Sequence, residues 1–101
     1  CKYKVGMLYF EWDDTKARRN LGKHGVSFSE ARSVFLDENA VQFYDDEHSL
    51  GEDRFLLLGM SNQFRMLVVV HAERSKSSVI RIISARKATS REAGFYLRGA
   101  K

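Results

Sequence analysis

The sequence predicts a single α+β domain, with two helices near its start, a central antiparallel sheet after them and a short helix at its end. Apolar residues recur at helical spacing as far as Phe35, and from Ala40 the apolar pattern alternates with a period of two. A capping motif at residues 89–92 then marks the start of the last helix. The 101 residues suffice for one modest core, and neither a proline nor a Ser/Gly-rich linker marks a boundary. We therefore expect residues 1–101 to form one domain.

Local signals predict the first strand and the first helix. The aromatic segment LYFEW at residues 8–12 is typical of a strand. Asp13 or Asp14 offers an N-cap, and acidic residues suit the positive end of a helix dipole. The helix should end at about His24, because cations occupy its last turn and Gly25 follows them.

A second helix is predicted to begin after Ser27. The segment from Ser27 to Glu30 has the pattern of a capping box, in which the Glu30 side chain would return to the Ser27 amide. Phe28, Ala31 and Phe35 are spaced so that they face the protein interior.

The sheet should follow as a meander of four further strands, at residues 40–44, 54–61, 66–71 and 79–85. The third of these is apolar on both faces, which predicts a central strand. In the fourth, strict alternation would place Ile80, Ile82 and Ser84 on one face and Arg81, Ile83 and Ala85 on the other. A capping box from Thr89 to Glu92 should then start the terminal helix, which carries Phe95 and Tyr96.

Charge is unevenly distributed along the chain. Residues 1–62 carry 8 Lys/Arg against 11 Asp/Glu, a net of −3, whereas residues 63–101 carry 9 against 2, a net of +7. Such a dipolar chain should have one surface that attracts a polyanion, and RNA or DNA is the first candidate.

Several classes of protein are disfavoured. The one cysteine, Cys1, excludes an internal disulfide and a cysteine-based metal cluster, and no charge pattern beside it suggests a nucleophile. His24, His48 and His71 are too scattered for a zinc site, so we expect neither a metal nor another cofactor.

The longest apolar run, residues 66–70, is too short to span a bilayer, and no signal peptide is visible. We expect a cytoplasmic protein without membrane contact. Residues 1–7 are interpreted as a tag or a non-native start, since Met7 is a candidate natural initiator.

Five ordered sequence blocks resemble one family. They are FEWD at 10–13, NLGKHGVSFSEA at 20–31, GEDRFLLLG at 51–59, VVVHAER at 68–74 and RIISARKATSRE at 81–92. Together they resemble the BrnT family, small ribonuclease toxins of type II toxin–antitoxin systems that are related in fold to the RelE-like toxins. The resemblance implies a RelE-like α+β fold, endoribonuclease activity that inhibits growth, and neutralisation by a BrnA-like antitoxin. It also implies a toxin2–antitoxin2 heterotetramer that contacts operator DNA through the antitoxin.

RNA cleavage without a metal needs a base for the 2′-hydroxyl proton, cations for the phosphorane and an acid for the leaving oxygen. The candidate catalytic residues are His71, Arg81, Arg86, Lys23 and His24. The candidate RNA-binding residues are Lys87, Arg74, Arg91 and Tyr96.

Each candidate also has a structural interpretation. His71 could be a hydrogen-bonded histidine at a strand end, and Arg81 could form a salt bridge with Glu73 or another acid. Lys23 and His24 complete a helix C-terminus, Arg86 and Lys87 could lie in a solvated turn, and Tyr96 could pack on the sheet.

Two geometric expectations follow for the catalytic candidates. Arg81 should stand beside His71 across a hairpin. If the chain turns at about Ala85, Arg86 swings to the same side as Arg81, so that Arg81 acts on the transition state and Arg86 on substrate binding.

A rival interpretation makes the chain a non-catalytic module that binds nucleic acid or a repressor partner through the same basic face. It ranks second, because neither a helix-turn-helix nor an RNP-type aromatic strand is apparent. Because a toxin must be silenced, an antitoxin segment should cover the basic face, with acids that mimic phosphates.

Overall fold

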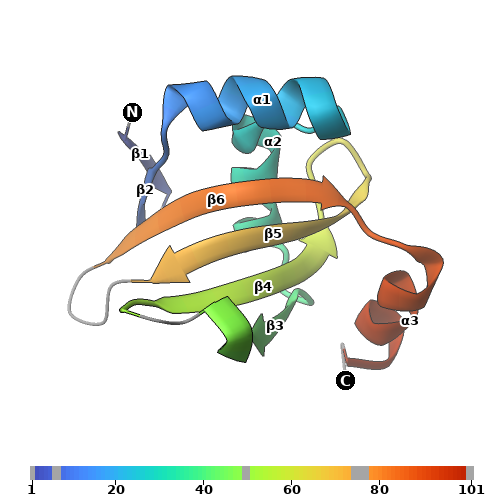
Figure 1. Ribbon diagram of the computed structural model, residues 1–101. Coiled ribbons are helices and arrows are strands. Elements are labelled where there is room, and N and C mark those ends of the chain that lie inside the picture. Colours follow the sequence, from blue (N-terminus) through green and yellow to red (C-terminus); the bar gives the residue numbers. More distant parts are fainter. Residues whose placement is uncertain (1, 6–7, 49–50, 74–77, 100–101) are drawn as a thin grey trace.

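A six-stranded mixed sheet organises the computed structural model, with the strand order β1-β2-β6-β5-β4-β3 (Figure 1). The structure describes residues 2–5, 8–48, 51–73 and 78–99. The strands are β1 (Lys2–Val5), β2 (Leu8–Glu11), β3 (Val41–Tyr44), β4 (Asp53–Met60), β5 (Met66–Glu73) and β6 (Val79–Lys87). The helices are α1 (Asp14–His24), α2 (Phe28–Ser33) and α3 (Ser90–Gly99), with short 3₁₀ helices η1 (Val34–Leu36) and η2 (Asp46–His48). None of the described helices is long and apolar enough to cross a membrane.

The α+β class and the order of the elements are confirmed, but the sheet is not wholly antiparallel. Strands β3 to β6 form the predicted antiparallel meander, and β5 is one of its two central strands. Strand β2 instead pairs in parallel with β6, through residues 9–11 and 79–81. The long connection through both helices and the meander allows this parallel return.

The predicted helix caps are mostly present. The Asp13 side chain accepts the Thr15 amide, and Gly25 ends α1 in the left-handed region with φ 69°. The capping box of α3 is complete: the Thr89 amide donates to Glu92 Oε1 at 2.9 Å, and the Glu92 amide donates to Thr89 Oγ1 at 3.1 Å.

The capping box of α2 forms only in half, which corrects the prediction. Ser27 Oγ accepts the Glu30 amide at 3.0 Å, but the Glu30 carboxylate does not return to Ser27. It accepts hydrogen bonds from Ser61 Oγ at 2.6 Å and from Arg65 Nε at 2.9 Å instead. A charged guanidinium is a stronger partner than a neutral amide, so the tertiary contact replaces the local one.

Strand β6 contains a β-bulge at Ile83. His71 on β5 lies opposite Ile82 and Val70 lies opposite Ser84, which leaves Ile83 as the extra residue. The bulge reverses the predicted alternation, because Ala85 is fully buried with Ile82 although strict alternation placed them on opposite faces. The strand also continues to Lys87, beyond the predicted end at residue 85.

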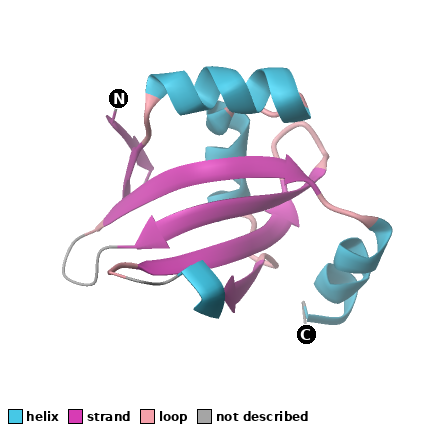
Figure 2. Cartoon of the chain, in the orientation of Figure 1, coloured by secondary structure: helices cyan, strands magenta, loops and turns pink. Residues whose placement is uncertain are grey.

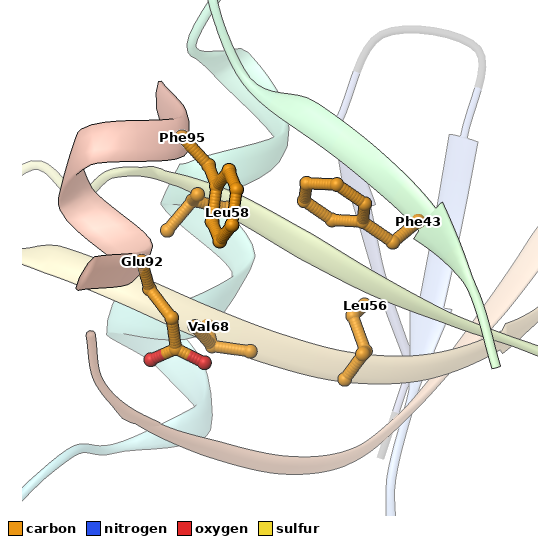
Figure 3. Close-up of a pocket in the computed structure, with 6 residues that line it drawn as sticks. All are labelled: Phe43, Leu56, Leu58, Val68, Glu92 and Phe95. Atoms are coloured by element: carbon orange, nitrogen blue, oxygen red, sulfur yellow. The ribbon is translucent and has the colours of Figure 1, made fainter. Parts of the chain in front are cut away.

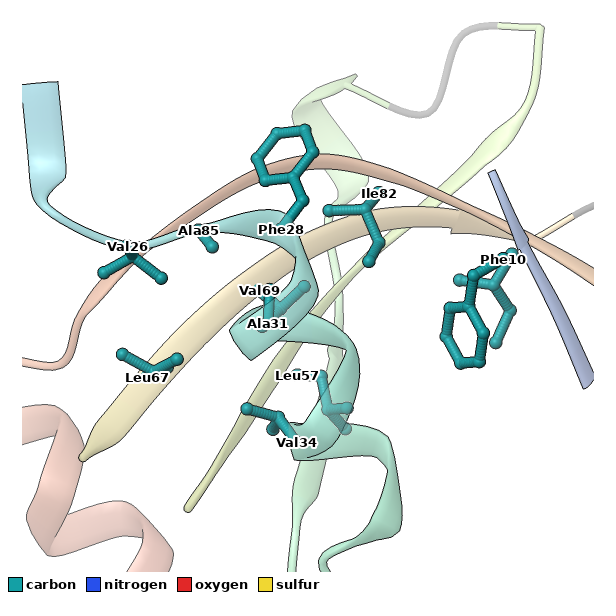
Figure 4. Close-up of a cluster of buried hydrophobic side chains, with 11 residues drawn as sticks. Phe10, Val26, Phe28, Ala31, Val34, Leu57, Leu67, Val69, Ile82 and Ala85 are labelled. Carbon is teal, nitrogen blue, oxygen red and sulfur yellow. The ribbon is translucent and has the colours of Figure 1, made fainter. Parts of the chain in front are cut away.

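The hydrophobic core lies between the sheet and the α1–α2 region (Figures 2 and 4). We call this side of the sheet the core face and the opposite side the outer face. The core consists of Phe10, Val26, Phe28, Ala31, Val34, Leu57, Leu67, Val69, Ile80, Ile82 and Ala85. Phe28 and Ala31 are buried as predicted, and Phe35 packs against the cluster.

The Asn20 side chain joins α1 to β6 beyond Arg81, where the edge of β6 that faces β2 is no longer paired with it. The described pairing of β2 stops at Arg81, so the edge of β6 beyond it faces α1. Asn20 donates to the Ala85 carbonyl at 2.8 Å and accepts from the Ala85 amide at 3.1 Å, as a neighbouring strand would. It also donates to the Val26 carbonyl at 2.9 Å. One buried amide therefore satisfies three main-chain groups.

Helix α3 covers one end of the outer face. Its Phe95 ring lies edge-on to Phe43, with centroids 6.2 Å apart, and its Tyr96 hydroxyl donates to Asp37 Oδ2 at 2.7 Å. Between helix and sheet lies an apolar pocket of about 160 Å³, lined by Phe43, Leu56, Leu58, Val68, Glu92 and Phe95 (Figure 3). The Glu92 carboxylate accepts two hydrogen bonds from the Arg86 guanidinium, both at 2.8 Å.

We expect Asn20→Ala to destabilise the fold by about 3 kcal/mol, because it leaves buried main-chain groups of Ala85 and Val26 without their partner. Urea unfolding measures this loss. Asn62→Ala, at an exposed asparagine, is the matched control and should change stability by less than about 0.5 kcal/mol. Equal stability of the two variants would contradict this role for Asn20.

Glu92→Gln should weaken the attachment of α3 in a pH-dependent way. Arg86 is the main cause that lowers the pKa of Glu92 from 4.5 to about 2. Since the folded-state pKa is depressed, the stabilisation is complete above about pH 4.5 and is lost as the pH falls towards 2. We expect a loss of about 1 kcal/mol at pH 7 after solvent screening. Urea titrations should show that the difference from the parent shrinks at pH 3. Glu38→Gln, at an exposed glutamate, is the control for the removal of one carboxylate. A pH-independent difference would contradict the ion pair as its source.

Candidate nucleic-acid interface

A basic groove runs between α1 and β6. It has a volume of about 260 Å³ and is lined by Lys16, Arg19, Asn20, Lys23, His24, Ile83 and Ser84. None of these described lining residues is acidic. An open groove with several cations and no carboxylate in its lining is suited to a phosphate backbone.

Helical spacing places these cations on one side of α1. Lys16, Arg19 and Lys23 are three or four residues apart, and all three side chains are exposed. His24 is half-buried at the last turn. Because Asn20 lies on the same side and is bonded to β6, the cations are held beside Ile83 and Ser84 at the bulge.

Two of the predicted catalytic residues, Lys23 and His24, therefore lie together in this groove. Lys16 and Arg19 were missed by the sequence reasoning. Their helical spacing from Lys23 was the available signal, but it indicates only a shared helix side. That this side borders β6 depends on the tertiary contact of Asn20.

Arg81 and Arg86 lie on the outer face of the sheet. Arg81 is the cross-strand partner of Ala72, and Arg86 is the partner of Val68, two residues that lie on the same face of β5. The expected shared side is therefore found, but the predicted turn at Ala85 is wrong. The strand continues, and the bulge at Ile83 shifts the alternation instead.

Both arginines form ion pairs, as the structural interpretation of Arg81 allowed. Arg81 pairs with Glu52, and its side chain is 33% exposed. Arg86 pairs with Glu92, and its side chain is 39% exposed. The expectation that Arg86 and Lys87 lie in a turn after the strand is wrong, since both belong to β6.

His71 is enclosed on the core face and does not stand beside Arg81. Its cross-strand partner is Ile82, and its side chain is fully buried. The ring lies 4.9 Å from the Phe35 centroid and 5.7 Å from that of Phe55. Its Nε2 atom lies 3.0 Å from Glu73 Oε2, and burial lowers the pKa of the imidazole. The imidazole is therefore buried and bonded to Glu73 through Nε2, as its structural interpretation allowed.

The predicted RNA-binding residues are dispersed. Lys87 is exposed at the end of β6, and Arg91 is exposed in the first turn of α3. Tyr96 packs on the sheet side of α3, where its bond to Asp37 raises the pKa of its hydroxyl. Arg74 lies outside the described residues. Within the described part of the chain, no group of three His, Cys, Asp or Glu side chains could hold a metal ion.

Comparisons with known proteins show which solved structure the fold resembles and which family model the chain matches. It is similar to the crystal structure of the Brucella abortus ribonuclease toxin BrnT, with a TM-score of 0.62 and 23% sequence identity. The match covers 80% of this chain and 96% of that chain. No curated protein matches the chain significantly. The family model described as the ribonuclease toxin BrnT of type II toxin–antitoxin systems matches residues 12–92. The chain therefore belongs to the BrnT family of ribonuclease toxins of type II toxin–antitoxin systems.

Proposed function

We propose that this protein is a metal-independent endoribonuclease toxin that cleaves RNA and arrests growth until a cognate antitoxin neutralises it. The observation that carries the proposal is the basic groove between α1 and β6. Membership of a ribonuclease toxin family supports the same reaction class.

In this proposal the RNA backbone lies along the groove, and Lys16, Arg19 and Lys23 bind its phosphates. The 2′-hydroxyl gives its proton to a base as its oxygen attacks the adjacent phosphorus, and the bond to the 5′-oxygen breaks as an acid gives that oxygen a proton. The products are a 2′,3′-cyclic phosphate and a 5′-hydroxyl. An imidazole can exchange protons near neutral pH whereas lysine and arginine stay charged, so we assign proton transfer to His24.

The outer-face arginines have a supporting role. Ser84 lines the groove and lies between Arg81 and Arg86 along β6. Their positive charge extends the basic surface from α1 across the strand, although Glu52 and Glu92 offset part of it. Exposed Lys87 and Arg91 attract RNA in the same way. We assign His71 to the core, since its enclosed ring does not reach a bound phosphate without local opening.

We expect the purified protein to degrade single-stranded RNA in EDTA. His24→Gln should lower kcat by about 100-fold and leave RNA affinity nearly unchanged, because it removes a proton-transfer group. Gel assays of cleavage and anisotropy measurements of binding test both parts. Intact RNA with folded parent protein contradicts the enzyme, and binding without cleavage favours the non-catalytic module.

Arg19→Ala should weaken RNA binding and reduce the slope of log affinity against log salt by about 1, because one phosphate contact is lost. Arg18→Ala is the matched control. It removes the same charge from the next position of α1, where the side chain lines a different pocket with Trp12 and Phe28. Equal effects of the two substitutions would show that net charge, and not the groove, governs binding.

We further propose that the BrnA-like antitoxin covers this groove with acidic side chains, in a toxin2–antitoxin2 heterotetramer that binds operator DNA through the antitoxin. Co-expression should restore growth, and hydrogen exchange should show slower exchange in α1 and β6 of the complex. Protection confined to β3 and the acidic segment around η2 would contradict occlusion of the groove.

A further inference from the structure

The turn between β4 and β5 displays a phenylalanine in an unusual conformation. Phe64 has φ 60°, and it is the one residue other than glycine with positive φ among the described residues. Its side chain is 88% exposed, more than any other large hydrophobic residue that the structure describes. Phenylalanine is not favoured in the left-handed region, and an exposed ring gains nothing from burial. The backbone conformation opposes stability and burial of the ring does not offset it, which points to a use of the ring outside the fold.

Hydrogen bonds hold this turn firmly. The Phe64 amide donates to the Ser61 carbonyl at 3.0 Å, and the Ser61 amide donates to the Arg65 carbonyl at 2.9 Å. Ser61 Oγ donates to the buried carboxylate of Glu30 at 2.6 Å. The Asn62 amide donates to Ser33 Oγ at 2.8 Å. The ring of Phe64 is therefore presented from a turn that is bonded on both sides to α2.

The same turn lies beside the end of the basic groove. Arg65, the residue after Phe64, forms an ion pair with Glu30 and donates from Nη2 to the Gly25 carbonyl at 3.0 Å. Gly25 directly follows Lys23 and His24, which line the groove. In Figure 1 the yellow turn between β4 and β5 lies next to the C-terminal end of α1. The turn that carries the exposed Phe64 ring thus lies close to the cationic end of α1.

We propose that Phe64 is a stacking platform for an unpaired base of RNA whose backbone occupies the basic groove. The proposal rests on the proposed ribonuclease function and specifies its substrate class: RNA with an unpaired nucleotide next to the bound phosphates. Single-stranded nucleic acid is bound by this combination, a cationic track for the backbone and an aromatic face for a base.

The surroundings of Phe64 favour a base over a protein side chain. Its neighbours along the turn, Asn62 and Gln63, are exposed and polar, so polar groups flank the ring. The anchor of a protein–protein interface lies among other apolar contacts that exclude water. A nucleobase needs only one accessible ring face with polar groups around it.

Three variants test the proposal. Phe64→Gly removes the ring and suits the left-handed backbone, so it should raise the thermal midpoint while it weakens binding. Phe64→Trp keeps a stacking surface and should keep affinity. Leu97→Ala is the matched control, because Leu97 is 72% exposed on α3 and apolar. The probes are a single-stranded 2′-O-methyl oligoribonucleotide, which cannot be cleaved by 2′-hydroxyl attack, and a blunt duplex of the same sequence.

We expect Phe64→Gly to bind the single strand about tenfold more weakly than the parent, and to bind the duplex within about twofold. Phe64→Trp and Leu97→Ala should bind both probes like the parent. The combination of higher stability and weaker single-strand binding separates a binding role from a folding role.

Single-strand binding by Phe64→Gly within about twofold of the parent would overturn the stacking proposal. If Arg19→Ala still weakens binding in that case, the proposed ribonuclease function stands without it. An equal loss on both probes would also overturn stacking, as would a loss confined to antitoxin binding. A folded parent that neither binds nor cleaves RNA would refute the proposed function itself.

Discussion

The arrangement of the molecule depends on how the open part of the β6 edge is covered. A strand edge without a neighbour leaves main-chain donors and acceptors exposed. Here one amide side chain, Asn20, supplies both a donor and an acceptor to Ala85. The helix that carries Asn20 must therefore lie against the strand in one register. The cations three or four residues away on α1 are placed beside the β6 bulge by the same two bonds. The groove is thus in part a consequence of edge protection, since the bonds that cover the strand edge also hold the cations of α1 beside it.

The fold redistributes the charges that appear segregated in the sequence. Acids from the first half of the chain pair with arginines from the second half, in Glu30–Arg65 and Glu52–Arg81. The basic groove, in contrast, takes its cationic lining residues from α1, within the half whose net charge is −3. Net charge along the chain therefore predicted a polyanionic partner but did not locate the basic groove. A charge that the fold pairs with a carboxylate contributes less to the long-range field than one that faces solvent alone.

Local chemistry explains what could be predicted. The α1 cap at Asp13, the left-handed Gly25 and the Thr89–Glu92 box depend on residues within a few positions of each other, and all are present. The bulge at Ile83 could not be read from the alternation, because it arises from how β5 and β6 pair. This one-residue shift placed His71 and Arg81 on opposite faces and Arg81 and Arg86 on the same face. The predicted bond from the Glu30 carboxylate to the Ser27 amide was wrong for a similar reason. The residue that bonds the carboxylate, Arg65, is 35 positions from Glu30.

The Glu30–Arg65 pair shows why such distant contacts matter for the site. Glu30 is almost fully buried, and the hydrogen bond from Arg65 is the main cause that lowers the pKa of its carboxyl. Burial of the carboxylate opposes that shift, so the pair adds less to stability than its geometry suggests. Its effect on shape is larger, because Arg65 also bonds the Gly25 carbonyl and Glu30 also bonds Ser61. The end of α1, the start of α2 and the β4–β5 turn are thereby fixed to one another. The groove beside Lys23 and His24 and the turn that carries Phe64 therefore keep a constant relation, which is the condition for preorganised recognition.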